Sequence, residues 1–137
     1  MPSRETLLRT AFLAGAITDA LAVVPMVLPP LARSVWGLDT ASGAYRFAIG
    51  YAAALMLGWT ALLVWAFQRP IERSGVAALT VLVIWGLVAT EIVAVATGGL
   101  ALWRAIPTWC LQAMLLSLFA AGYHYDRAKI LFAPSNA

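Results

Sequence analysis

The sequence predicts an all-α integral membrane protein, built as a four-helix bundle with antiparallel neighbours and short loops. Of its 137 residues, 63% are hydrophobic and 11% are charged, whereas soluble domains carry about 25% charged residues. The mean hydropathy of +0.87 indicates the same class. Four apolar runs reach the roughly 20 residues that a helix needs to cross a bilayer. We therefore interpret residues 1–137 as a single transmembrane domain.

The spans are bounded by capping and helix-breaking residues. They are predicted at residues 7–28, 44–67, 76–97 and 107–125, with a short interfacial helix at residues 30–36 on the outer surface. Ser3 can cap the first helix, and Pro29 ends it. The second span ends before Pro70, and the third ends at Gly98. Pro107 suits the first turn of the fourth helix, where a backbone donor is not needed.

Positive charges divide unequally between the two sides of these spans. Six lie on the side of the termini and the middle loop: Arg4, Arg9, Arg69, Arg73, Arg127 and Lys129. Three lie on the other side: Arg33, Arg46 and Arg104. Because positive loops stay in the cytoplasm, we expect a multi-pass protein of the cell (inner, cytoplasmic) membrane with both termini cytoplasmic. Isolated basic residues of this kind indicate membrane lipids as partners and no nucleic acid.

Small residues recur at four-residue spacing in three spans. They are Ala11 and Gly15, then Gly50, Ala54 and Gly58, then Ala113, Ser117 and Ala121. This spacing lets helix backbones approach closely in a membrane. We interpret it as packing within the bundle, and keep as an alternative that Gly50, Ala54 and Gly58 form a homodimer face.

Each span contributes one polar residue to the outer half of the bundle. Counting about 1.5 Å per residue places Arg46, Gln112, Glu91 and Asp19 at increasing depth below the outer surface. A charge at the membrane centre costs about 2.5–3.5 kcal/mol on insertion scales, so the two carboxyls should avoid lipid. We predict an outward-opening pocket for a ligand or proton, lined by these four residues and Trp109.

A structural role for the same residues stays open. Arg46 could extend to the outer headgroups and serve no ligand. Glu91 could pair with Arg46, or accept hydrogen bonds, only to set helix register. A buried carboxyl could also stay protonated and inert.

The sequence contains few side chains that could bind a metal or a cofactor. It has one histidine, His124, and one cysteine, Cys110, so neither bis-histidine haem ligation nor a disulfide is available within one chain. The spans contain no lysine for a retinal-type Schiff base. No nucleophile elbow, phosphate loop or metal-ligand spacing occurs. We expect no cofactor and no metal.

Part of the second span and the loop after it are similar to known membrane proteins. The run IGYAAALMLGWT at residues 49–60, followed by Pro70, Arg73 and residues 79–80, resembles small prokaryotic four-span membrane proteins that have no assigned function. The resemblance extends over most of the chain. It implies a multi-pass fold and transfers no catalytic residue.

The buried carboxyls resemble features of two better-known groups. Asp19 resembles the acidic residue in the first helix of small multidrug exporters, although the surrounding pattern of that family is absent. Asp19, Glu91 and Trp109 together are similar in kind to the buried acids and aromatic residues of sterol isomerases, which bind lipid-like ligands.

Three functions remain in competition. The leading hypothesis is a module that binds or transports a small hydrophobic or cationic ligand from the outer leaflet, with Asp19 and Glu91 as charge partners and Gln112 and Trp109 orienting it. An alternative is a structural or accessory membrane subunit or homo-oligomer. A further alternative is an intramembrane acid–base enzyme acting on a lipid-like substrate, which requires two carboxyls of different proton affinity.

Overall fold

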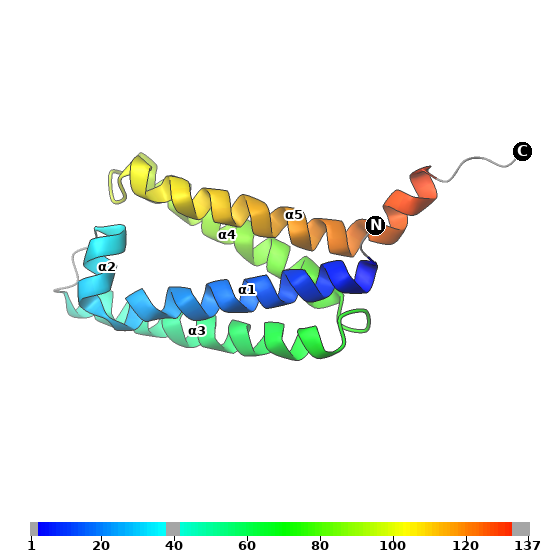
Figure 1. The fold of residues 1–137 in the computed structure, drawn as a ribbon. Helices are drawn as coiled ribbons and strands as arrows, with labels where there is room; N and C mark the ends of the chain where they lie inside the picture. Colours follow the sequence, from blue (N-terminus) through cyan, green and yellow to red (C-terminus); the bar gives the residue numbers. More distant parts are fainter. Residues whose placement is uncertain (1–2, 38–41, 133–137) are drawn as a thin grey trace, which may run out of the picture.

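The computed structural model describes residues 3–37 and 42–132, with side chains described as far as His124. These residues form α1 (Arg4–Val27), α2 (Pro29–Trp36), α3 (Gly43–Gln68), α4 (Gly75–Ala96) and α5 (Leu102–Phe132) (Figure 1). Helices α1, α3 and α4, and residues 102–124 of α5, are long and apolar enough to cross a membrane. The predicted all-α class with four spans is confirmed for the described residues.

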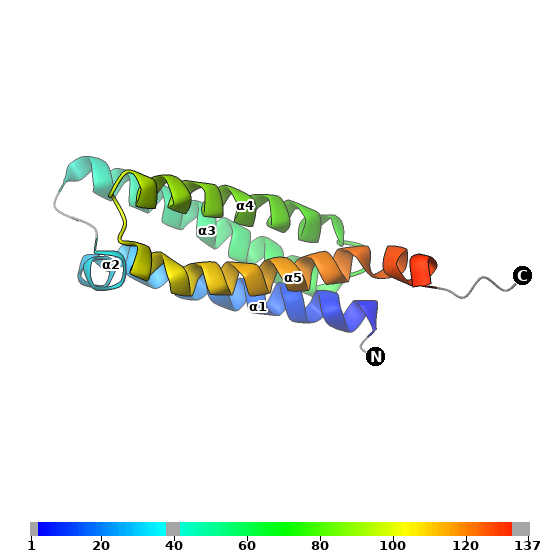
Figure 2. The same cartoon turned by 90° about the horizontal axis from the view of Figure 1, so that it is seen from above.

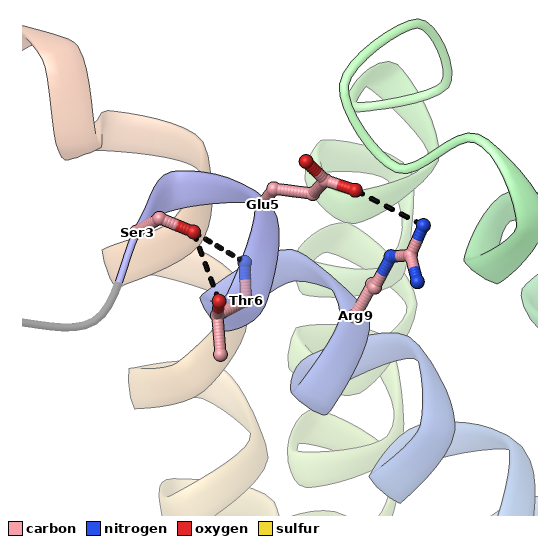
Figure 3. Close-up of polar contacts among 4 residues, drawn as sticks. All are labelled: Ser3, Glu5, Thr6 and Arg9. Carbon is pink, nitrogen blue, oxygen red and sulfur yellow. Dashed lines mark hydrogen bonds and ion pairs between the residues drawn. The ribbon is translucent and has the colours of Figure 1, made fainter.

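Helix α1 begins three residues earlier than predicted because its capping residue supports an extra turn. The Ser3 hydroxyl accepts a hydrogen bond from the Thr6 backbone N–H at 3.1 Å, and the two hydroxyls lie 2.9 Å apart. One turn further, Arg9 pairs with Glu5 at 3.0 Å (Figure 3). The Ser3 cap satisfies the Thr6 backbone N–H, a donor that the helix itself leaves unpaired.

The start of α5 differs from the prediction. The helix begins at Leu102, so Pro107 lies inside it rather than in its first turn. Pro107 cannot donate to the carbonyl four residues earlier, and membrane helices tolerate such a loss when neighbouring groups compensate. The added turn is held by tertiary contacts: Ala105 is buried, and Arg104 bonds to α2.

The short segment predicted at residues 30–36 is helical and forms α2, which is hydrogen-bonded to α5. Arg104 donates from Nη1 to the carbonyl oxygens of Ser34 at 2.8 Å and Arg33 at 3.4 Å. Gly37 ends α2 in the left-handed region with φ of 71°, and a Cβ there would lie 3.0 Å from the Arg104 guanidinium carbon. Glycine therefore suits this helix end twice, by its backbone and by its size. The membrane-surface position of α2 stays a prediction.

The four spans pack unevenly. Helix α1 packs along α3 and α5, and α4 packs along α5, whereas α3 and α4 contact each other little. In Figure 1 the α1–α3 pair and the α4–α5 pair diverge toward the end where α2 lies, and Figure 2 shows α3 and α4 on the same side of the molecule. The loop after α3 and the N-terminus lie at the opposite end. The bundle is therefore open between two helices that are consecutive in sequence.

The tightest packing lies toward the end that holds the N-terminus. Leu8, Phe12, Leu63 and Phe119 are the largest fully buried side chains. The rings of Phe12 and Phe119 meet edge to face with centroids 5.8 Å apart, an arrangement that aromatic pairs prefer. Gly15 lies at this junction, where an added Cβ would come within 3.1 Å of both Leu63 and Phe119. The small residues of α1 serve bundle packing, as predicted.

The other two runs of small residues face away from the bundle. Gly50, Ala54 and Gly58 are exposed, and an added Cβ at either glycine would meet no atom within 4 Å. The run Ala113, Ser117 and Ala121 on α5 is also exposed. Their interpretation as packing within the bundle is wrong, because α3 and α5 turn other faces toward the core.

Candidate functional site

A cleft separates α3 from α4 and has α1 and α5 as its floor. Its volume is about 460 Å³, and residues of all four spans line it. The lining is almost entirely apolar. The lining residues include Asp19, Ala52, Trp59, Thr80, Val83 and Leu87. We call this space the Asp19 cleft.

Asp19 is the only ionisable side chain among the described residues that line the cleft. Gly15, four residues earlier on α1, also lines the cleft. Residues four apart share a helix face, so this face of α1 points into the cleft. The residue is half-buried, and its carboxyl forms no hydrogen bond or ion pair with any residue that the structure describes. A carboxylate in such surroundings lacks the partner that buried charges normally have.

The remaining polar groups of the cleft do not supply that partner. The Thr80 hydroxyl donates to the Val76 carbonyl oxygen of its own helix at 2.8 Å. The indole Nε1 of Trp59 is buried and forms no hydrogen bond within the described chain. The cleft therefore combines an unpaired acid, an unused indole donor and apolar walls.

Glu91 lies in a different place, between α4 and α5. Its Oε1 accepts a hydrogen bond from Gln112 Nε2 at 3.1 Å, and Gln112 is 6% exposed. The Trp109 indole lies close enough to the Glu91 carboxyl to interact with it. However, its Nε1 does not reach hydrogen-bond geometry. We call the two hydrogen-bonded residues the Glu91–Gln112 pair.

The structure thus divides the predicted pocket. Glu91, Gln112 and Trp109 come together, Asp19 lines a separate cleft, and none of the three lines that cleft. Arg46 is exposed near the start of α3 and forms no hydrogen bond or ion pair with Glu91 or Asp19. Residue counting along each predicted span placed all of these residues in the outer half of the bundle. The rotation of each helix, which depth does not determine, placed them on different faces.

The α3 side of the cleft does not follow from the sequence pattern. Ala52 and Trp59 line it, whereas the pattern predicts Arg46 as the pocket residue of this helix. A tryptophan in the middle of a span was the available signal, because membrane tryptophans concentrate at the interfaces. Trp59 lies about two thirds of the way along α3 and more than two turns from its end at Gln68.

The two remaining residues singled out from the sequence lie apart from both carboxyls. Cys110 is exposed on α5. His124 contacts the Tyr123 ring edge to face at 5.0 Å and lines a small cavity of about 130 Å³ between α4 and α5. Among the described residues, no three His, Cys, Asp or Glu side chains gather where they could hold a metal ion.

Comparisons with protein-family models, with curated proteins and with solved structures found no match to this chain. The resemblance read from residues 49–60 therefore identifies no family.

Proposed function

We propose that this chain binds a small amphipathic cation in the Asp19 cleft, with the Asp19 carboxylate as the counter-charge. The observation that carries the proposal is that the one ionisable residue of an apolar cleft has no partner within the described chain. An uncompensated charge in such a place is costly, and a bound cation removes most of that cost.

The dimensions and lining of the cleft support a ligand with an apolar body. Ligand cavities usually measure about 300–1,000 Å³ and combine apolar walls with a few polar groups. The cleft, at about 460 Å³, has this character. Trp59 adds an aromatic ring, and aromatic faces attract cations.

The access route that fits this cleft runs sideways between α3 and α4. The two helices contact little, and the lining residues Leu55, Val83 and Leu87 are 63%, 37% and 40% exposed. An apolar rim favours a ligand that first dissolves in the bilayer over one that arrives from water. We propose transport as the cellular use of this binding, in the cell membrane, with both termini cytoplasmic as the arginine distribution predicts.

The test compares two probes of the same shape and opposite charge. Wild type in lipid nanodiscs should bind tetraphenylphosphonium and reject tetraphenylborate, measured by isothermal titration calorimetry. Asp19→Asn should weaken phosphonium binding about 100-fold, because truncating one member of a desolvated charge pair costs about 2–5 kcal/mol. Glu91→Gln replaces the other carboxyl of the spans, which does not line the cleft, and should leave the affinity unchanged. Equal affinity in wild type and Asp19→Asn would overturn the proposal.

A homo-oligomer is the second candidate, favoured by the exposed run Gly50, Ala54 and Gly58 on α3. Close helix contact through such a run is a known mode of association in membranes. Native mass spectrometry of wild type beside a Gly50→Leu/Gly58→Leu variant should then show loss of the dimer. A monomer in both would remove this candidate. The acid–base enzyme hypothesis gains no support, because only one of its two carboxyls lines the cleft.

A further inference from the structure

The Glu91–Gln112 pair contains one formed hydrogen bond and two acceptors with none. Gln112 Nε2 donates to Glu91 Oε1 at 3.1 Å. The other oxygen of each side chain, Glu91 Oε2 and Gln112 Oε1, is buried and has no hydrogen-bond partner in the described chain. Buried acceptors are rarely left unpaired, so each such atom calls for a chemical explanation.

A single proton accounts for both atoms. We infer that Glu91 is a proton-binding site, held as the neutral acid at neutral pH by Gln112. A carboxylic acid and a primary amide form a closed ring of two hydrogen bonds. The amide N–H donates to one carboxyl oxygen, as observed, and the acid O–H on Oε2 donates to the amide oxygen. An ionised Glu91 would have no proton to donate and would leave Gln112 Oε1 without a hydrogen-bond partner in the described chain.

The surroundings of Glu91 favour the neutral form. On α5 it faces Gln112 and Trp109, whose N–H groups can stabilise a carboxylate but carry no positive charge. The other carboxyl of the spans, Asp19 on α1, lines the cleft on a separate face, and Arg46 on α3 forms no ion pair with Glu91. No charged side chain of the described residues compensates a negative Glu91. Burial disfavours an uncompensated charge, and proton uptake from water at the outer end forms the O–H bond and cancels the charge.

The pair lies one helical turn from the Asp19 cleft. Leu87, four residues before Glu91 on α4, and Leu115, three residues after Gln112 on α5, both line the cleft. Release of the proton would break the second hydrogen bond and loosen α4 from α5 at the wall of the cleft. The inference stands on the pair itself and does not depend on what the cleft binds.

The other glutamates make the test selective. The chain has three, and Glu5 and Glu72 form ion pairs with Arg9 at 3.0 Å and Arg69 at 3.2 Å on exposed surfaces. A protonated glutamate at neutral pH therefore has one source. We would prepare wild type by cell-free synthesis with glutamate carrying ¹³C at its carboxyl carbon, and record the infrared carboxylic-acid C=O stretch in nanodiscs.

The expected result is a C=O band at neutral pH that shifts with the ¹³C label. It should vanish in Glu91→Gln, which keeps an amide that can pair with Gln112, and persist in Asp19→Asn. In Gln112→Leu it should move to higher frequency or disappear, because the hydrogen-bonded ring is gone. Absence of a labelled band in wild type would overturn the inference. A band unaffected by Gln112→Leu would overturn the assignment of Gln112 as its partner.

Discussion

Asp19 and Glu91 carry the same functional group inside two of the apolar spans, yet their surroundings in the fold are opposite. Asp19 lines an open apolar cleft and has no partner in the described chain. Glu91 lies between two packed helices and accepts a hydrogen bond from Gln112. The difference follows from the bundle, which closes between α4 and α5 and opens between α3 and α4. The closed interface supplies a partner for Glu91, and the open one leaves Asp19 without a partner in the described chain.

The largest effect on ligand binding is expected from filling the cleft without changing either carboxyl. Ala52→Phe places a ring in the Asp19 cleft from α3. It should weaken tetraphenylphosphonium binding about tenfold or more, because overpacking an occupied site costs about 1–3 kcal/mol. Calorimetry on nanodiscs measures this change.

The matched control for that variant is Arg46→Gln, which changes an exposed residue of the same helix. Its phosphonium affinity should equal that of wild type. The infrared band assigned to Glu91 should also be the same in both variants. Unchanged binding in Ala52→Phe would show that the ligand lies outside the cleft.

A smaller effect should separate the two carboxyls by stability. Asp19→Leu should raise the free energy of unfolding by about 1 kcal/mol or more, because burying a polar group without a partner costs about 1–3 kcal/mol in protein mutants. Glu91→Leu should lower it by about 1–3 kcal/mol, because the buried Gln112 amide loses its partner. Steric-trapping measurements of unfolding in bicelles provide both values.

Two other outcomes would contradict the expected stability difference between Asp19 and Glu91. If Asp19→Leu destabilised the bundle as much as Glu91→Leu, Asp19 would be a structural residue and its cleft no ligand site. If Glu91→Leu were neutral, Gln112 would have another partner. Thr80→Val serves as the control, since the Thr80 hydroxyl bonds only within its own helix in the described chain.

Helix content and membrane class were predictable because they depend on local sequence. Apolar runs of sufficient length specify spans, and Ser3, Pro29 and Gly98 lie at or next to helix ends as expected. The start of α5 was not predictable from Pro107. The extra turn depends on Arg104 contacting α2, which lies about 70 residues away in the chain.

The candidate site was likewise predictable only in part. The sequence alone identified Asp19 and Glu91 as groups that must avoid lipid, because the cost of exposing a carboxyl is a property of the residue. It also identified Gln112 and Trp109 as pocket residues. It could not show that Asp19 lies apart from the other three, nor that Trp59 and Ala52 complete its cleft. Those facts depend on how each helix is rotated and on the separation of α3 from α4. Apolar spans in lipid lack a strong preference for any one face, so only the packed bundle decides which carboxyl is paired and which is left open.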